Sequence, residues 1–335
     1  MGVPGFFQWL IKRNDGNIDQ LVKNSIDIQP DILYIDANCL FHPQCFKVLE
    51  LNKNEKDVSK LEDLMFERII KYIEFLIEFS NPKELVYIAV DGVAPLAKIS
   101  QQRKRRYRSI DDTDLKNEIK KKHNIDSNDI WSNIVITPET DFMVKLDNVL
   151  NKHFSEIKHN VIIMYSSYKD YGEGEHKILQ HIKNNNNNDK IILIYGLDAD
   201  LFFLAMTTGI NNIFLLREAY HFTNDVVDND SDNIKEILKY VPIDKVKHMC
   251  NSTINEIILS KSKHKLNRPN IQNDDNYIND FIFICYLLGN DFLPHLPSID
   301  IKKKGIETIL NAYADIYIEY NQKLIKNDLR INNDF

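Results

Sequence analysis

Residues 191–200 read Ile-Ile-Leu-Ile-Tyr-Gly-Leu-Asp-Ala-Asp, an apolar run followed by a turn and two carboxylates. A short apolar run that stops at glycine is typical of a buried strand. The same order occurs twice earlier in the chain, where the run 32–35 precedes Asp36 and the run 85–90 precedes Asp91. Ligands of open α/β sheets bind beyond the carboxyl ends of the strands, so we expect these acids to meet in one crevice.

Segments with helical periodicity lie between the apolar runs and predict the fold class. Two apolar stripes recur at helical spacing: Leu61, Met65, Ile69, Ile73 and Leu76, and then Phe142, Leu146, Val149, Leu150 and Phe154. The second helix is expected to begin with Thr137 as its cap, Pro138 at its first position and Glu139 in its first turn. Further strands are expected at 161–165 and 213–216. Alternating strands and helices predict an α/β fold, in which helices cover both faces of a mostly parallel central sheet.

The most distinctive short motif is 172–177, which reads Gly-Glu-Gly-Glu-His-Lys. Its glycines let the backbone turn tightly, so that both carboxylates can approach one ion. An acidic helix start is the alternative. Nearer the C-terminus, Gly289 is expected to end a buried helix over 281–288 and to turn Asp291 toward the same crevice.

Seven acids thus share one kind of position, at a strand end or in a tight turn, and are the candidate catalytic residues and metal ligands: Asp36, Asp91, Glu173, Glu175, Asp198, Asp200 and Asp291. Carboxylates packed so closely repel one another unless cations are present. Oxygen donors suit a hard ion, Mg²⁺ or Mn²⁺, and a two-metal centre that cleaves phosphodiesters is the natural interpretation. The alternative for Asp198 and Asp200 is that they face solvent at a strand-to-helix junction.

A basic segment follows Asp91 closely, with Pro95 well placed to start a helix. Four side chains fall within an arc of roughly 100° on this predicted helix: Lys98, Gln102, Arg105 and Arg106. Such a face can receive a phosphate, because arginine offers planar, paired hydrogen bonds. A solvated basic face and a nuclear-localisation patch are the alternatives.

Three histidines and one aromatic pair lie close to the candidate acids in the sequence. His42 lies six residues beyond Asp36 and could stack on a nucleobase, with a structural surface histidine as the alternative. His176 and His295 lack metal-ligand spacing to another histidine, so we expect them to be structural or to support the metal ligands. Phe202 and its neighbour Phe203 are expected in the core.

The amino-acid composition limits the kinds of protein that this chain can be. The chain has 335 residues and 43% hydrophobic content, which supports a substantial core, and its net charge of -7 means that any polyanion site must be local. The four cysteines form no Cys-x-x-Cys pair, which fits a reducing compartment. The longest apolar run, 281–288, is too short to span a bilayer. We therefore expect a soluble, cytoplasmic protein, with a nuclear location or a viral origin as alternatives.

Several strings closely resemble the Xrn-type 5′→3′ exoribonuclease family and occur in the family's order: 1–4 with 6–7, 34–38, 90–95 with 101–103, 136–138 with 142–143, 172–177, 195–200, 215–218 and 289–297. The resemblance implies a flap-endonuclease-like (PIN-like) nuclease core, in which the seven acids bind two Mg²⁺ ions and RNA is cleaved one nucleotide at a time from its 5′ end. It assigns a pocket for the 5′-monophosphate of single-stranded RNA to Lys98, Gln102, Arg105 and Arg106, and stacking on the first base to His42. A role in RNA decay follows from the same resemblance.

The resemblance also bears on domain organisation. Residues 1–310 are predicted to form the nuclease domain, with a peripheral, partly helical excursion around 223–276 and a solvated asparagine loop at 184–188. Residues 311–335 are predicted to form a C-terminal helical extension. The family's second conserved region, which supplies an aromatic partner for the base, is expected to be absent. A compact member, a fragment, and a subunit whose protein partner supplies that region are the three alternatives.

Two rival functions remain open at this point. A structure-specific 5′ flap nuclease acting on DNA would share the carboxylates but would need a duplex-binding element that the sequence does not reveal. A noncatalytic RNA-binding scaffold is the more distant rival. The seven acids argue against it, because a scaffold has no reason to keep so much mutual repulsion.

Overall fold

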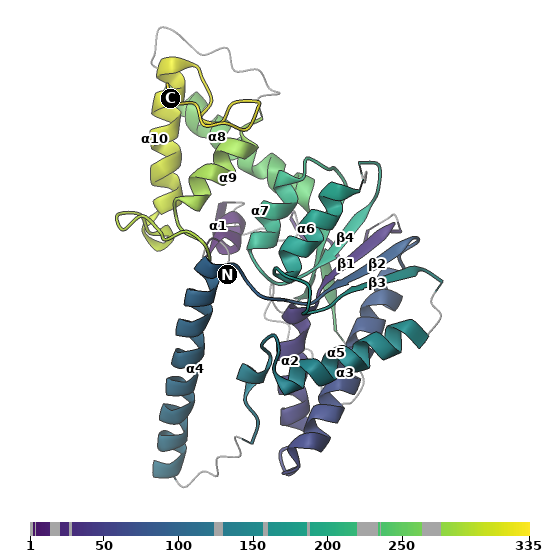
Figure 1. Cartoon of the computed structure of the whole chain (residues 1–335). Coiled ribbons are helices and arrows are strands. Elements are labelled where there is room, and N and C mark those ends of the chain that lie inside the picture. Colours follow the sequence, from purple (N-terminus) through teal and green to yellow (C-terminus); the bar gives the residue numbers. More distant parts are fainter. Residues whose placement is uncertain are drawn as a thin grey trace. The chain divides into compact units, whose positions relative to one another are not determined.

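The computed structural model describes residues 3, 5–13, 21–26, 29–123, 130–156, 160–185, 188–219, 234, 236–262 and 276–335 (Figure 1). The chain divides into two compact units. The sheet unit comprises Ile26–Leu197 and Leu216–Lys239, and the helical unit comprises Met1–Ser25, Asp198–Leu215 and Tyr240–Phe335. The domain boundary expected at residue 310 stays a prediction.

Six strands form one sheet in the order β3-β2-β1-β4-β5-β6. Their bounds are β1 (Ile32–Asp36), β2 (Leu85–Ala89), β3 (Ile162–Ser166), β4 (Ile192–Tyr195), β5 (Ile213–Glu218) and β6 (Leu238–Pro242). β1 pairs in parallel with both β2 and β4, and β2 pairs in parallel with β3. The predicted apolar runs therefore form strands, and the expected α/β fold with a mostly parallel central sheet is confirmed.

Helices of the sheet unit cover both faces of the sheet. They are α2 (Ala37–Leu51), α3 (Val58–Ser80) and α5 (Asp141–Glu156) on one side of the strands and α6 (Gly174–Asn184) on the other (Figure 1). The chain builds β1, β2 and β3 outward and then returns to β4, so right-handed connections place α6 on the opposite face from the earlier helices. The strand order reverses between β1 and β4, and ligands of such sheets bind near that switch point, at the carboxyl ends of the strands.

α3 forms where the first apolar stripe predicts it. Asp57 caps its N-terminus by accepting hydrogen bonds from the N–H groups of Ser59 (3.0 Å) and Lys60 (3.5 Å). Asn81 ends the helix in the left-handed conformation, with a φ of 45°. All members of the stripe are buried: Leu61, Met65, Ile69, Ile73 and Leu76.

The expected start of α5 is wrong by one turn. Thr137 does not cap the helix; Thr140 does, because its Oγ1 accepts a hydrogen bond from the N–H of Met143 (3.4 Å). Glu139 has a φ of 70°, a left-handed conformation that cannot belong to an α-helix. A tight turn therefore precedes the helix, and Thr140 Oγ1 also donates to the carbonyl oxygen of Thr137 (2.9 Å).

The helical unit contains α1 (Phe6–Arg13), α7 (Asp200–Thr207), α8 (Ile243–Ser262), α9 (Ile278–Tyr286), α10 (Gly305–Tyr320) and the 3-10 helix η4 (Ile301–Lys303). Its core gathers around Phe6, whose ring centroid lies 4.6 Å from that of Phe203 and 6.1 Å from that of Phe281. Phe202 is also buried, so the aromatic pair is core as expected. Gly289 follows α9 with a φ of 85°, and a Cβ there would lie 2.6 Å from the backbone nitrogen of His295. Glycine is thus required where the sequence predicts a helix end.

The excursion expected at 223–276 is partly helical, because α8 lies within it. This helix buries Val246, Cys250 and Ile254 and packs against α10. Residues 220–233, 235 and 263–275 lie outside the described residues, as do Met1, Gly2 and Pro4 of the N-terminal string and Asn186 and Asn187 of the asparagine run. Among the helices that the structure describes, none combines the length and the apolar character needed to cross a membrane.

Candidate active site

The carboxyl end of β1 carries the first of the predicted acids. Asp36 is buried at the junction between β1 and α2, where the N-terminus of the helix favours a negative charge. Its Oδ2 accepts a hydrogen bond from Cys39 Sγ (3.0 Å), and the N–H of Leu197 donates to the same sulfur (3.4 Å). Cys39 therefore ties the end of β1 to the segment that follows β4. Sequence reasoning assigned no role to this cysteine.

Asp91 follows β2 and is held by two hydrogen bonds. Its N–H donates to Asn38 Oδ1 (2.9 Å), and its Oδ1 accepts from the N–H of Gly174 (2.6 Å). A Cβ at Gly174 would lie 2.6 Å from Asp36 Oδ1 and 3.3 Å from Asp91 Oδ1. The second glycine of the motif is thus required by the close approach of two carboxylates, one from each strand.

The loops after β2 and β3 pair through their backbones beside this point. The N–H of Gly92 donates to the carbonyl oxygen of Gly172 (2.9 Å), and the N–H of Gly172 donates to that of Val93 (3.1 Å). Gly172 has a φ of 95°, so the first glycine of the motif supplies the tight turn that the sequence predicts. A Cβ at Gly92 would lie only 1.8 Å from the carbonyl oxygen of Asp170, so this crossing leaves no room for a side chain.

Glu173 and Glu175 lie on either side of Gly174, and both are buried. With His176 they form a group whose possible ligand atoms all lie within 4.8 Å of one another, an arrangement that could hold a metal ion. His176 Nδ1 lies 3.7 Å from Glu173 Oε2 and 3.8 Å from Glu175 Oε1. Burial lowers the pKa of His176, with Glu173 opposing and Lys98 adding to the shift. The sequence predicts that His176 is structural or supports the metal ligands, and in the structure it lies next to Glu173 and Glu175 themselves.

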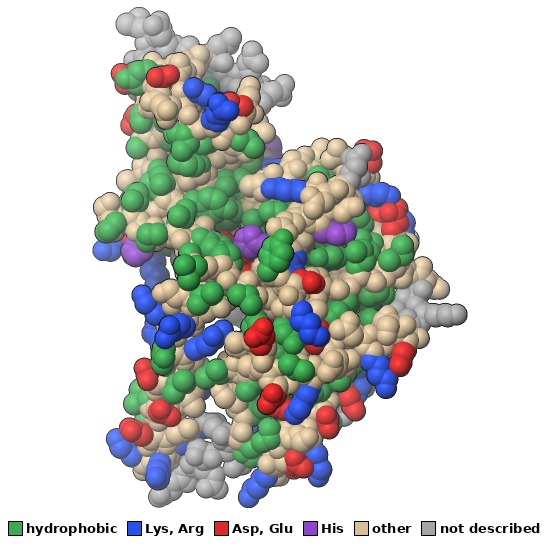
Figure 2. Space-filling model, viewed as in Figure 1, with side chains coloured by type: hydrophobic (Ala, Val, Ile, Leu, Met, Phe, Trp, Pro, Cys, Tyr) green, Lys and Arg blue, Asp and Glu red, His purple; other side chains and the backbone are tan. Residues whose placement is uncertain are grey.

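The acid cluster contacts the basic helix α4 (Leu96–Lys122) through one buried ion pair. Lys98 Nζ lies 2.5 Å from Glu173 Oε1, and the side chains are only 7% and 4% exposed. Lys98 is the one buried residue of α4, all of whose residues are described. Gln102 and Arg106 are half-buried and Arg105 is exposed, further along the predicted face. Lys and Arg side chains gather over α4 in Figure 2.

Lys177, the last residue of the motif, braces the strand ends. It is buried, and its Nζ donates to the carbonyl oxygens of Val90 (2.7 Å) and Ser167 (2.8 Å). Burial lowers the pKa of Lys177, while the charges of Asp170 and Asp91 act to raise it. Sequence reasoning assigned no role to this lysine, although its place four residues after Glu173 on a helix that starts at the sheet was a usable signal.

The remaining three acids belong to the helical unit. Asp200 is buried at the first position of α7, Asp291 is buried after the turn at Gly289, and Asp198 is partly exposed. The solvent-facing alternative therefore fails for Asp200. That all seven acids form one centre stays a prediction.

The other predicted histidines differ in exposure. His42 lies half-buried on α2, and burial lowers its pKa. His295 is exposed after α9. A stacking role for the first and a structural role for the second both stay predictions.

The donor set of the sheet unit fits a hard divalent cation. Asp36 and Asp91 approach each other at Gly174, Glu173 and Glu175 flank the same glycine, and Lys98 pairs with Glu173. Glu173 Oε2 is buried and has no hydrogen-bond partner in the described part of the chain. Oxygen donors with surplus negative charge are what Mg²⁺ and Mn²⁺ require. This end of the sheet can therefore hold a metal ion.

Two family models and several known proteins match this chain. The family model described as "XRN 5'-3' exonuclease N-terminus" matches residues 1–219, and the one described as "Xrn1 helical domain" matches residues 271–334. "5'-3' exoribonuclease 2" of Arabidopsis thaliana is 31% identical over 94% of this chain and 37% of its own length. "5'-3' exoribonuclease 1" of Saccharomyces cerevisiae is 32% identical over 94% of this chain and 21% of its own length. The chain therefore spans well under half the length of these relatives.

Among solved structures, the catalytic core of Rad2 in complex with DNA substrate matches with a TM-score of 0.43 and 14% identity, over 92% of this chain and 67% of that chain. A likeness at this level supports no argument about function. The family is shown instead by the model that matches residues 1–219, well over half of the chain. The chain belongs to the XRN 5′-3′ exonuclease family.

Proposed function

We propose that the chain is a Mg²⁺-dependent 5′→3′ exoribonuclease that releases mononucleotides from single-stranded RNA with a 5′-monophosphate. One observation carries the proposal: the buried contact between Lys98 and Glu173. It joins a cluster of acids that can hold metal to a basic helix face that can hold a phosphate. Membership of the XRN family supports the same activity.

The seven predicted acids would hold two Mg²⁺ ions, or Mn²⁺ in their place: Asp36, Asp91, Glu173, Glu175, Asp198, Asp200 and Asp291. When bound, such ions polarise the scissile phosphate and lower the pKa of the attacking water. The protein's part is to keep the donors in position before the ions arrive. Cys39, Asn38 and Lys177 do so through hydrogen bonds to the acids or to the strand ends that carry them.

The face of α4 would bind the 5′ end of the RNA. A terminal phosphate can accept several charge-assisted hydrogen bonds from Arg105, Arg106 and Gln102. An internal phosphodiester cannot enter a pocket formed by these side chains as deeply. Because Lys98 starts this face and contacts Glu173, a phosphate bound there would lie next to the acid cluster. A capped or triphosphate end would be too large.

His42 would stack on the first base. Burial lowers its pKa, so the ring would be neutral at neutral pH. The second stacking surface would come from a further region or from a protein partner. The physiological setting that we propose is RNA decay in the cytoplasm.

The decisive experiment compares three forms of one RNA, with a 5′-hydroxyl, a 5′-monophosphate and a 5′-triphosphate, each with and without Mg²⁺. We expect rapid release of mononucleotides from the monophosphate form alone, and only with metal. Internal fragments from all three forms would contradict a 5′→3′ exonuclease. Equal cleavage of a matched DNA flap would favour the rival DNA nuclease.

A further inference from the structure

A basic hollow lies wholly within the helical unit. It has a volume of about 830 Å³ and is bounded by α1 on one side and by η4 with the start of α10 on the other. Cavities of roughly 300–1,000 Å³ are the usual size for small-ligand sites. A single phosphate would fill only a small part of this space.

Cations dominate the lining. Lys12 and Arg13 come from α1, and Lys302 and Lys304 come from the opposite wall. Within the part of the chain that the structure describes, no ion pair involves Lys12, Lys302 or Lys304, whereas Arg13 pairs with Glu256 (2.9 Å). A cluster of this kind in a protein of net charge -7 forms a local site for a polyanion.

The one carboxylate in the lining has a structural role. Glu307 Oε1 accepts a hydrogen bond from Trp9 Nε1 (2.9 Å), which joins the two walls. Its Oε2 is buried and has no hydrogen-bond partner among the described residues. A ligand that carries hydroxyl or amino groups, as a nucleotide does, can donate a hydrogen bond to that oxygen, whereas an ionised phosphodiester group has no proton to donate.

The hollow also reaches the segment that carries two of the predicted metal ligands of this unit. Ala199 forms part of its wall, and this residue stands between Asp198 and Asp200. Phe7 lines the same wall and stacks on Phe202, with ring centroids 5.4 Å apart and planes 25° from parallel. A strand in the hollow would therefore contact aromatic and cationic groups beside two of the acids, the combination that binds single-stranded nucleic acid.

We propose that this hollow, the α1 pocket, binds the sugar-phosphate backbone of the single-stranded RNA substrate at nucleotides other than the 5′ end. The inference rests on the proposed function for the identity of the strand. Lys12, Lys302 and Lys304 contact phosphates, and Glu307 accepts from a hydroxyl or amino group of the same strand. The pocket adds affinity without choosing the 5′ end.

The test is the salt dependence of binding to a 3′-labelled oligouridylate with a 5′-hydroxyl, measured by fluorescence anisotropy. This end keeps the proposed 5′-monophosphate site from contributing. Lys12→Ala with Lys302→Ala removes two phosphate contacts, so the slope of log K against log salt should become shallower by about 1.4, at about 0.7 per contact on a single strand. The matched control is Lys303→Ala with Lys326→Ala, two exposed lysines of the same unit that do not line the pocket.

Each outcome decides the matter. A slope in the pocket variant equal to that of the control overturns the proposal, and so does an equal loss of affinity for a labelled dinucleotide, which would assign the pocket to small anions. Failure of the wild type to bind the oligouridylate also overturns it. The proposed function is tested separately: if the wild type degrades no RNA while the pocket variant loses binding as expected, the pocket stands and the exoribonuclease activity falls.

Discussion

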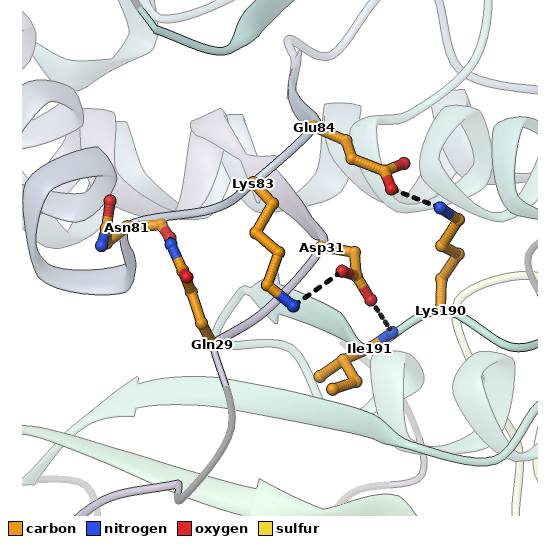
Figure 3. A network of polar contacts seen from close by, with 7 residues as sticks. All are labelled: Gln29, Asp31, Asn81, Lys83, Glu84, Lys190 and Ile191. Atoms are coloured by element: carbon orange, nitrogen blue, oxygen red, sulfur yellow. Dashed lines mark hydrogen bonds and ion pairs between the residues drawn. The ribbon is translucent and has the colours of Figure 1, made fainter.

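The acidic side chains at the two ends of the sheet differ in how they are paired with cations. At the amino end, Asp31 accepts hydrogen bonds from Lys83 Nζ (3.1 Å) and from the N–H of Ile191 (2.8 Å), and Lys190 pairs with Glu84 (Figure 3). Two acids therefore meet two lysines. This network links the starts of β1, β2 and β4 and leaves no net charge.

At the carboxyl end, Asp36 and Asp91 approach each other at Gly174, and Lys98 contacts Glu173, which precedes that glycine. Paired charges at the amino end add a little to stability, as exposed ion pairs usually do. Closely packed carboxylates at the other end repel one another and lower stability unless a cation is bound. The proposed function accounts for this difference, because the acids at the carboxyl end are its proposed metal ligands.

The largest expected effect comes from breaking the buried ion pair between Lys98 and Glu173. Lys98→Met leaves Glu173 buried without its cation and should lower the free energy of unfolding by about 3–5 kcal/mol in metal-free buffer. Lys83→Ala is the matched control at the amino end, where the pair is exposed and should contribute about 0–1 kcal/mol. Urea unfolding measures both. Equal losses would mean that the two ends do not differ in the way described.

A smaller effect concerns metal affinity. Glu175→Gln keeps the size of the side chain but removes a charge, so the Mg²⁺ concentration that half-saturates the protein should rise about 100-fold or more, since even residues that only orient ligands cost about 10–100-fold. The rise in melting temperature on adding Mg²⁺ reports this without any turnover. Without metal the variant should be as stable as the wild type or more stable, because one source of repulsion is gone.

The control for metal affinity is Glu84→Gln at the amino end. It also removes a carboxylate from the sheet unit, but one that already pairs with Lys190. Its Mg²⁺ response should match that of the wild type. A parallel loss in this variant would trace the metal effect to overall charge and not to the carboxyl end.

The third prediction concerns the selection of the 5′ end of the RNA by the α4 face. Arg106→Ala should reduce the preference for 5′-monophosphate over 5′-hydroxyl RNA by about 10-fold or more, because a charged hydrogen bond contributes about 1.5–3 kcal/mol. Initial rates on both RNAs give the ratio. The control is Arg103→Ala, an exposed cation of the same helix outside the predicted face. An unchanged ratio in the first variant would remove α4 from end binding.

The smallest expected effect lies at the amino end and depends on pH. Burial acts to raise the pKa of Asp31, but the N–H of Ile191 and the ammonium of Lys83 together hold it below its usual value. A carboxyl whose pKa is lower in the folded state adds stability above its unfolded pKa of about 3.9 and loses it as pH falls through the folded value. Asp31→Asn should therefore cost about 1 kcal/mol or less at pH 7, and the difference should vanish in more acidic buffer. A difference that grows in acid would contradict this.

Local patterns were enough for the elements and for the candidate acids. Apolar runs of four to six residues predict β1, β2 and β4, because a strand buried on both faces must be continuously apolar. Parallel strands end at the same edge, so acids that follow those runs were expected together, and Asp36 and Asp91 do meet at Gly174. The position of Thr140 as the cap of α5 was missed, because Thr137 carries the same local signal.

By itself, the sequence determined the α/β fold and the basic face of α4, and it predicted that the acids bind metal, since each depends on residues close together in the chain. Only the tertiary structure decided that Lys98 pairs with Glu173, that Cys39 contacts Leu197, that Lys177 holds the ends of β2 and β3, and that Lys12 and Lys302 share a hollow. These contacts join residues far apart in sequence, so the periodicity of apolar residues along the chain cannot predict them. Their partners are chosen by the packing of strands and helices, where the gain from satisfying a buried charge exceeds any local preference.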